Sequence, residues 1–174
     1  MAERYGKLDV LINNAGYAAI PPDPETDAQG YRAAFQSVYD VNVTSVALCV
    51  ALFLPLLRKS EDGRIVNVSS GRASMQILAS GEMPPTVSIP YSISKVALNA
   101  LTVEMSRFEE NSGVVFLVVG PGHCKTAFNG YRGVRDPMEG SVVVVECVVR
   151  SREEIGSAAF WETSGISREL VRVP

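Results

Sequence analysis

The stretch Arg64-Ile65-Val66-Asn67-Val68-Ser69 decides the fold, because its apolar residues follow one another instead of alternating with polar ones. Residues 8–13 and 114–119 form two further runs of the same kind. Strands with such continuous apolar runs are buried on both faces, as in a parallel sheet. The sequence therefore predicts three central strands of a parallel sheet.

Helical patterns occupy the segments between these runs, at residues 26–59 and 91–110. The turn residues Asp62-Gly63 and Asn111-Ser112-Gly113 follow them and lead into the next strands. This alternation predicts an α/β fold with a doubly wound parallel sheet and right-handed crossovers.

A further helix is expected at residues 137–150, with a proline in its first turn, and a last strand at residues 158–162. Residues 77–90 contain several prolines and a glycine, so we expect a loop there. No linker or internal repeat interrupts the pattern, which indicates one domain over residues 1–174.

Composition and charge narrow the possible partners. The 174 residues are 47% hydrophobic and 20% charged, and a net charge of −3 comes without any basic run, which argues against nucleic acid. The apolar stretch at residues 41–57 is interrupted by polar residues and Pro55, so we interpret it as a buried helix rather than a membrane span.

The cysteines indicate the compartment. Cys49, Cys124 and Cys147 are odd in number and lack metal-ligand spacing, which is typical of free thiols in a reducing compartment. We therefore expect a cytoplasmic protein without a metal site.

Tyr91 and Lys95 lie four residues apart, and at this spacing two side chains share one face of a helix. A neighbouring cation favours the phenolate, so it would draw the tyrosine pKa down toward neutral pH. The pair is therefore a candidate for acid/base catalysis.

Other polar residues stand near the ends of the predicted strands or inside an apolar helix. Ser70 follows the central strand, Asn14-Ala15-Gly16 follows the first, and Asn42 interrupts an apolar helical segment. Taken singly, each has a structural explanation. Ser70 can be a helix cap, residues 14–16 a turn, and Asn42 a partner in an internal hydrogen bond.

Taken together, Asn42, Ser70, Tyr91 and Lys95 resemble in order and spacing the short-chain dehydrogenase/reductase family, in its carbonyl-reductase-like branch. The Pro-Gly segment at residues 121–126 and the chain end extend the resemblance over nearly the whole sequence. The resemblance implies a Rossmann-type fold and an oxidoreductase that acts on a small carbonyl or alcohol substrate.

The resemblance also implies roles for the four catalytic candidates. Ser70 would polarise the substrate carbonyl oxygen, and Tyr91 would protonate it. Lys95 would hold the cofactor ribose and lower the Tyr91 pKa, while Asn42 would maintain a proton relay.

By the same resemblance the cofactor is NADP, favoured over NAD. Its binding residues would be Asn14, Ala15, Gly16, Tyr91, Lys95, Pro121, Gly122, Cys124 through its backbone, and Thr126 through its hydroxyl group.

Family members begin with a strand, a glycine-rich turn and a helix that receives the pyrophosphate, and this sequence contains no such turn. We therefore expect a partial Rossmann-type sheet, truncated to the C-terminal part of the fold, and doubtful activity of this chain alone. Two alternatives remain: an isomerase, lyase or cyclase that reuses the Ser-Tyr-Lys site without a cofactor, and a non-catalytic binding subunit. An open strand edge at residues 8–13 and the two long helices make a homo-oligomer possible.

Overall fold

The computed structural model describes residues 2–163 and 169–174, whose strands form one five-stranded sheet. The strands lie in the order β1-β2-β3-β4-β5, with the first four parallel and β5 antiparallel to β4. Their bounds are β1 (Val10–Asn13), β2 (Gly63–Val68), β3 (Val114–Gly120), β4 (Ala159–Thr163) and β5 (Leu170–Arg172). The expected α/β fold with a partial Rossmann-type parallel sheet is therefore confirmed.

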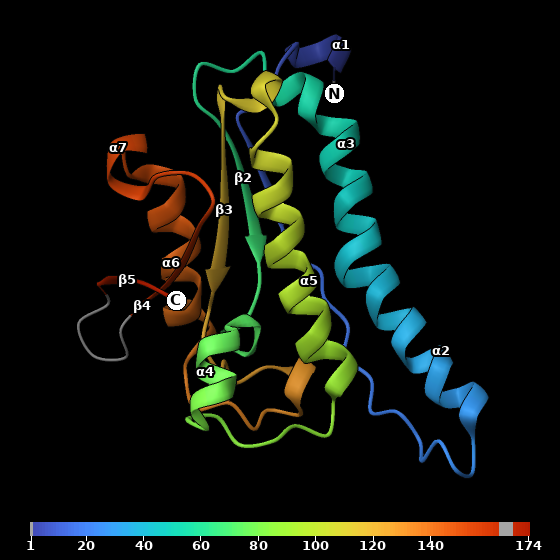
Figure 1. Ribbon diagram of the computed structural model, residues 1–174. Coiled ribbons are helices and arrows are strands. Elements are labelled where there is room, and N and C mark those ends of the chain that lie inside the picture. Colours follow the sequence, from blue (N-terminus) through green and yellow to red (C-terminus); the bar gives the residue numbers. More distant parts are fainter. Residues whose placement is uncertain (1, 164–168) are drawn as a thin grey trace.

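Helices connect the strands in the predicted alternation (Figure 1). The α-helices are α1 (Ala2–Tyr5), α2 (Ala28–Tyr39), α3 (Ser45–Leu57), α4 (Met75–Ser80), α5 (Ile89–Ser106), α6 (Pro137–Val149) and α7 (Arg152–Ile155). The π-helical turn η1 (Asp40–Thr44) joins α2 and α3 into one long rod, and short 3₁₀ turns lie at η2 (Gly71–Ala73), η3 (Glu109–Asn111) and η4 (Ala127–Asn129). The single helix expected at residues 26–59 is thus continuous but contains a π-turn.

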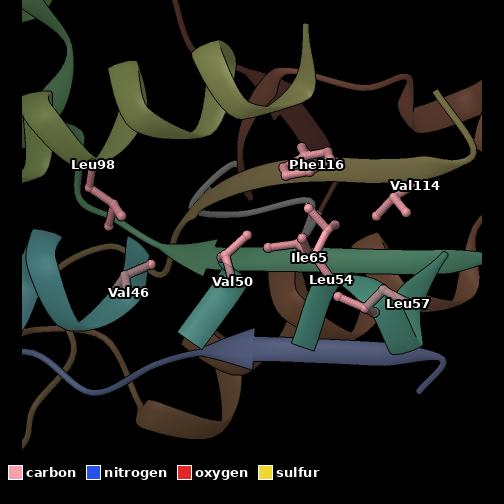
Figure 2. Close-up of a cluster of buried hydrophobic side chains, with 8 residues drawn as sticks. All are labelled: Val46, Val50, Leu54, Leu57, Ile65, Leu98, Val114 and Phe116. Atoms are coloured by element: carbon pink, nitrogen blue, oxygen red, sulfur yellow. The ribbon is translucent and has the colours of Figure 1, made fainter. Parts of the chain in front are cut away.

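Helices cover both faces of the sheet, as continuous apolar strands require. Helices α3 and α5 pack on one face, where Leu54 and Leu98 belong to one apolar cluster with Ile65 and Phe116 of the strands (Figure 2). Helix α6 packs on the other face, where Val143 contacts a second apolar cluster. The sheet is therefore doubly wound, as predicted.

The expectation of a loop over the whole of residues 77–90 is wrong at both ends, because α4 extends to Ser80 and α5 already begins at Ile89. Ser74 caps this helix by accepting a hydrogen bond from the Ile77 amide, and Gly81 ends it in the left-handed region at φ 78°. A serine cap and a terminal glycine therefore define a short helix within a segment whose prolines lie further on.

The rod formed by α2 and α3 is long and apolar enough, by length and composition, to cross a membrane. One face of α3 is buried in the core, as interpreted from the sequence, through Val50 and Leu54 among others. The opposite face is open, with Leu48 58% and Leu52 65% exposed. The burial expected of this segment therefore applies to only one of its faces.

A buried guanidinium fastens the beginning of β2 to the end of α6. The Arg64 side chain is 4% exposed and donates to the carbonyl oxygens of Cys147, at 3.0 Å, and Arg150, at 2.7 Å. It also pairs with Asp62, which receives a second hydrogen bond from Arg152. Arg64 thus satisfies carbonyl groups that the end of a helix leaves without intrahelical partners.

We predict that Arg64→Met lowers the free energy of unfolding by about 3 kcal/mol, because it leaves buried carbonyl groups unpaired. Urea unfolding of the purified chain measures the change. Arg107→Met is the control, since Arg107 forms an exposed pair with Glu104 and its loss is expected to change stability by less than about 0.5 kcal/mol. Equal effects of the two substitutions would contradict this interpretation of Arg64.

We also predict that the chain self-associates through the open face of α3, because exposed apolar side chains on neighbouring helical turns favour burial against a partner. Light scattering at several protein concentrations should show assemblies that the double substitution Leu48→Lys, Leu52→Lys disperses. Gln36→Lys, on the exposed side of α2, is expected to leave them unchanged. A wild-type chain that stays monomeric at every concentration refutes this prediction.

Candidate active site

Ser70 lies directly after β2, at the edge of the sheet where the parallel strands end. Its backbone is extended, and its Oγ accepts a hydrogen bond from the Arg72 amide at 3.3 Å, which caps the short turn η2. The Ser70 hydroxyl also faces the Tyr91 phenol closely enough to lower its pKa. The structure therefore brings the two residues together although they are far apart in the sequence.

Tyr91 and Lys95 share one face of α5, as their spacing predicts. Lys95 Nζ lies 5.7 Å from the centroid of the Tyr91 ring and donates a hydrogen bond to the Val68 carbonyl oxygen at 2.8 Å. Since Val68 ends β2, this bond ties the lysine to the same strand that presents Ser70. Serine, tyrosine and lysine thus gather at the C-terminal end of β2. Helix α5, which carries Tyr91 and Lys95, runs beside this strand (Figure 1).

The expected effect of Lys95 on the tyrosine is not observed. Burial raises the pKa of the Tyr91 phenol above its usual 10, while the hydrogen bond with Ser70 and the positive charge of Arg72 act in the opposite direction and are outweighed. Burial also lowers the pKa of Lys95 from 10.5 to about 8. Desolvation therefore dominates at both groups, and the phenol keeps its proton at neutral pH.

Asn42 lies in the π-turn η1 and is completely buried. Its Oδ1 accepts a hydrogen bond from the Tyr17 amide, and its Nδ2 donates to the Tyr17 carbonyl oxygen and to Ser94 Oγ, each at 2.8 to 2.9 Å. The residue therefore links the loop after β1 to the helix that carries Tyr91.

The segment Asn14-Ala15-Gly16 is exposed in the loop that follows β1. A Cβ atom added to Gly16 would lie 3.6 Å from Asn42 Oδ1 and 3.7 Å from Lys95 Nζ. The loop thus passes directly beside the catalytic candidates, as expected of a cofactor-binding segment at a strand end.

Residues 121–126 follow β3 at the same edge of the sheet, but their backbone is less available than expected. The Cys124 amide donates to the Gly122 carbonyl oxygen at 3.1 Å, and the Cys124 carbonyl accepts from Asn129 Nδ2 at 2.8 Å. The Cys124 amide and one lone pair of its carbonyl oxygen are thus used within the turn, and a second lone pair of that oxygen remains. That Cys124 offers its backbone to a cofactor stays a prediction.

Pro121, Gly122 and Thr126 are the other expected cofactor-binding residues of this segment, and the carbonyl oxygens of Pro121 and Gly122 already accept hydrogen bonds. Pro121 begins the turn, and Gly122 adopts φ 75°, a conformation that favours glycine. Thr126 forms a capping box with Asn129 in which its hydroxyl oxygen accepts the Asn129 amide. Since that hydroxyl acts as an acceptor, its proton is free to be donated to a ligand.

Two residues near Tyr91, and Glu162 near the Gly71 that follows Ser70, were not anticipated. The Phe128 ring lies 5.5 Å from the Tyr91 ring and covers it, and Arg72 brings a positive charge close to the phenol. Glu162, on β4, contacts the position of an added Cβ at Gly120 and has a buried oxygen without a partner among the described residues. No motif marks them in the sequence, because their nearness results from the fold.

Comparison with known proteins agrees with this geometry. Residues 1–134 match the family model of the short chain dehydrogenases. A short-chain dehydrogenase/reductase of Aspergillus fumigatus is 32% identical over 170 residues, which are 91% of this chain and 64% of that protein. The short-chain dehydrogenase anuI of Penicillium roqueforti is 38% identical over 149 residues, 82% of this chain and 58% of that protein. The chain thus spans about three fifths of the length of these relatives.

Solved structures of carbonyl reductases share the fold. The NADPH-bound carbonyl reductase from chicken fatty liver superposes with a TM-score of 0.75 at 26% identity, covering 92% of this chain and 66% of that one. The carbonyl reductase Sniffer of D. melanogaster reaches a TM-score of 0.73 at 23% identity, over 90% of this chain and 64% of that one. The matched family model, together with a serine, a tyrosine and a lysine gathered at the end of β2, shows that the chain belongs to the short-chain dehydrogenase family.

Proposed function

We propose that this chain is the catalytic part of a nicotinamide-dependent reductase of small ketones or aldehydes. The observation that carries the proposal is that the Ser70 hydroxyl faces the Tyr91 phenol beside the buried Lys95. A carbonyl oxygen placed against both hydroxyl groups would meet two hydrogen-bond donors, as in an oxyanion hole.

Each residue has a task that follows from its contacts. Ser70 Oγ accepts a backbone hydrogen bond and directs its own proton toward the Tyr91 phenol, so a substrate oxygen that enters between the two hydroxyl groups can take over this proton. Tyr91 keeps its proton at neutral pH because its pKa is raised, and it therefore suits a general acid that protonates that oxygen. Lys95, with a pKa of about 8, can carry a proton near neutral pH and resupply the phenol.

Asn42 is a positioning residue in this mechanism. Its hydrogen bonds hold the Tyr17 backbone and Ser94, so the loop after β1 stays close to Lys95. We propose that this arrangement keeps open the route by which Lys95 regains its proton.

The residues present fit the nicotinamide and ribose part of NADP. Gly16 leaves open space between Asn42 and Lys95 that a side chain would narrow, and the Thr126 hydroxyl has a free proton at the adjacent strand end. We propose Asn14, Ala15, Gly16, Tyr91, Lys95, Pro121, Gly122, Cys124 and Thr126 as the residues that hold this part of the cofactor. When bound, the cofactor would supply the hydride for the carbonyl carbon. NADP is favoured over NAD because a carbonyl reductase of the same fold is bound to NADPH.

The decisive test is carbonyl-dependent oxidation of NADPH by the purified chain. Tyr91→Phe removes only the hydroxyl group, so the rate is expected to fall by about 10² to 10⁴ while the fold is retained. Ser70→Ala should also reduce the rate, whereas Tyr31→Phe, on the remote helix α2, should not. Wild-type rates in both Tyr91→Phe and Ser70→Ala would show that the site is misidentified. Turnover that needs no nicotinamide would favour an isomerase or lyase instead.

A second prediction concerns Lys95 and pH. Its pKa is lower in the folded chain, about 8, than the usual 10.5, so the unfolded chain binds more protons between these values. Stability should therefore rise as the pH increases from about 8 to 10.5, and the charged lysine destabilises the fold at neutral pH.

Lys95→Met should consequently raise the free energy of unfolding at pH 7 by about 1 to 3 kcal/mol while abolishing turnover. Urea unfolding at pH 7 and at pH 10 gives the free energy of unfolding of the wild-type chain and of the variant. The difference in free energy of unfolding between the two chains should be smaller at pH 10 than at pH 7. No difference between the two chains, or the same difference at both pH values, would mean that Lys95 is not desolvated as described.

A further inference from the structure

A groove of about 430 Å³ opens between α4, the loop that follows it and the beginning of α5. Its walls are mainly apolar and are formed by Leu78, Met83, Pro84, Pro85, Ile89 and Ile93. Only a few polar groups line it, chiefly those of Arg72 and Ser92. Pockets of this kind bind small molecules with an apolar body, and the few polar groups decide which polar feature is recognised.

Arg72 brings an unpaired positive charge to this groove. Its Nη1 donates to the Pro84 carbonyl oxygen at 3.1 Å, which leaves the other guanidinium donors available. In the part of the chain that the structure describes, no carboxylate lies within ion-pair distance of it. A guanidinium in this state is suited to a planar anionic group such as a carboxylate.

Ser92 supplies a second, independent indication of a ligand. The residue is 6% exposed, lines the groove, and its Oγ has no hydrogen-bond partner among the described residues. A buried hydroxyl group without a partner is unfavourable, so a ligand that satisfies it gains affinity.

The groove begins beside the catalytic candidates. The Arg72 amide donates to Ser70 Oγ, and the positive charge of its side chain acts on the Tyr91 phenol. Ser92 directly follows Tyr91 on α5. A molecule anchored in the groove can therefore reach the two hydroxyl groups with its other end.

We propose that the groove is the specificity site for an apolar carbonyl substrate that bears a carboxylate, with Arg72 and Ser92 holding the carboxylate while the carbonyl group lies at Ser70 and Tyr91. This rests on the proposed reductase function, and it names the substrate class of the same site. Charge complementarity sets the preference, since the neutral analogue of such a substrate leaves the guanidinium unpaired.

Binding of 2-naphthoate and of uncharged 2-naphthamide to the purified chain tests the site without any cofactor. Calorimetry should give an affinity for the naphthoate about tenfold higher or more, because only the acid forms a charge-assisted bond with Arg72. Arg72→Gln should remove this preference, Arg72→Lys should retain part of it, and Ser92→Ala should weaken naphthoate binding. Arg107→Gln removes an exposed arginine at the far end of α5 and should change nothing.

A second readout tests whether the groove adjoins the tyrosine. Bound naphthoate neutralises Arg72, whose charge lowers the Tyr91 pKa, so the Tyr91 pKa should rise on binding and the NMR titration of labelled tyrosine should record it. Equal affinities for the acid and the amide, absent binding of both, or equal loss in Arg107→Gln would overturn the proposal. Because no nicotinamide is used, these failures are distinct from a failure of the reductase function, which the Tyr91→Phe turnover assay decides.

Discussion

The buried amide of Asn42 is the constraint on which the arrangement of the site depends. Without any exposed surface, it must find partners within the chain, and the Tyr17 backbone and Ser94 Oγ provide them. The π-turn that holds Asn42 lies inside the rod of α2 and α3, where apolar packing alone would favour a regular helix. These hydrogen bonds fasten three segments together, so Lys95 and Tyr91 keep a fixed position relative to the loop after β1.

Polar pairs also fix the register of the sheet. Continuous apolar strands can slide relative to one another with little change in burial. Asn67, inside β2, prevents this because its side chain is hydrogen-bonded both to strand β1 and to helix α5. It accepts a hydrogen bond from Asn13 on β1 and donates to Thr102 on α5, both at 2.8 Å. This chain of amides and a hydroxyl aligns the ends of β1 and β2, which is the alignment that the active-site residues require.

Much of this could be predicted from the sequence, because local patterns carry it. Continuous apolar runs identify β1, β2 and β3, and helical patterns identify the long helices and α6. The order of Asn42, Ser70, Tyr91 and Lys95 predicts their gathering, and the structure brings all four to one region. Helix α4 was missed because the prolines that follow it outweighed the Ser74 cap.

The protonation of the site could not be predicted in this way. Spacing places Lys95 beside Tyr91, but the balance between charge and desolvation depends on side chains from remote segments, such as Phe128, which covers the ring. Burial determines the direction of both pKa shifts: it raises the pKa of Tyr91, which holds its proton, and lowers the pKa of Lys95, which gives up its proton more readily. A tyrosine in this state is prepared to donate to a carbonyl oxygen rather than to accept a proton from an alcohol. In the reductase that we propose, desolvation of the pair suits the step in which Tyr91 donates its proton, and the positive charge of Arg72 acts against the rise of the Tyr91 pKa.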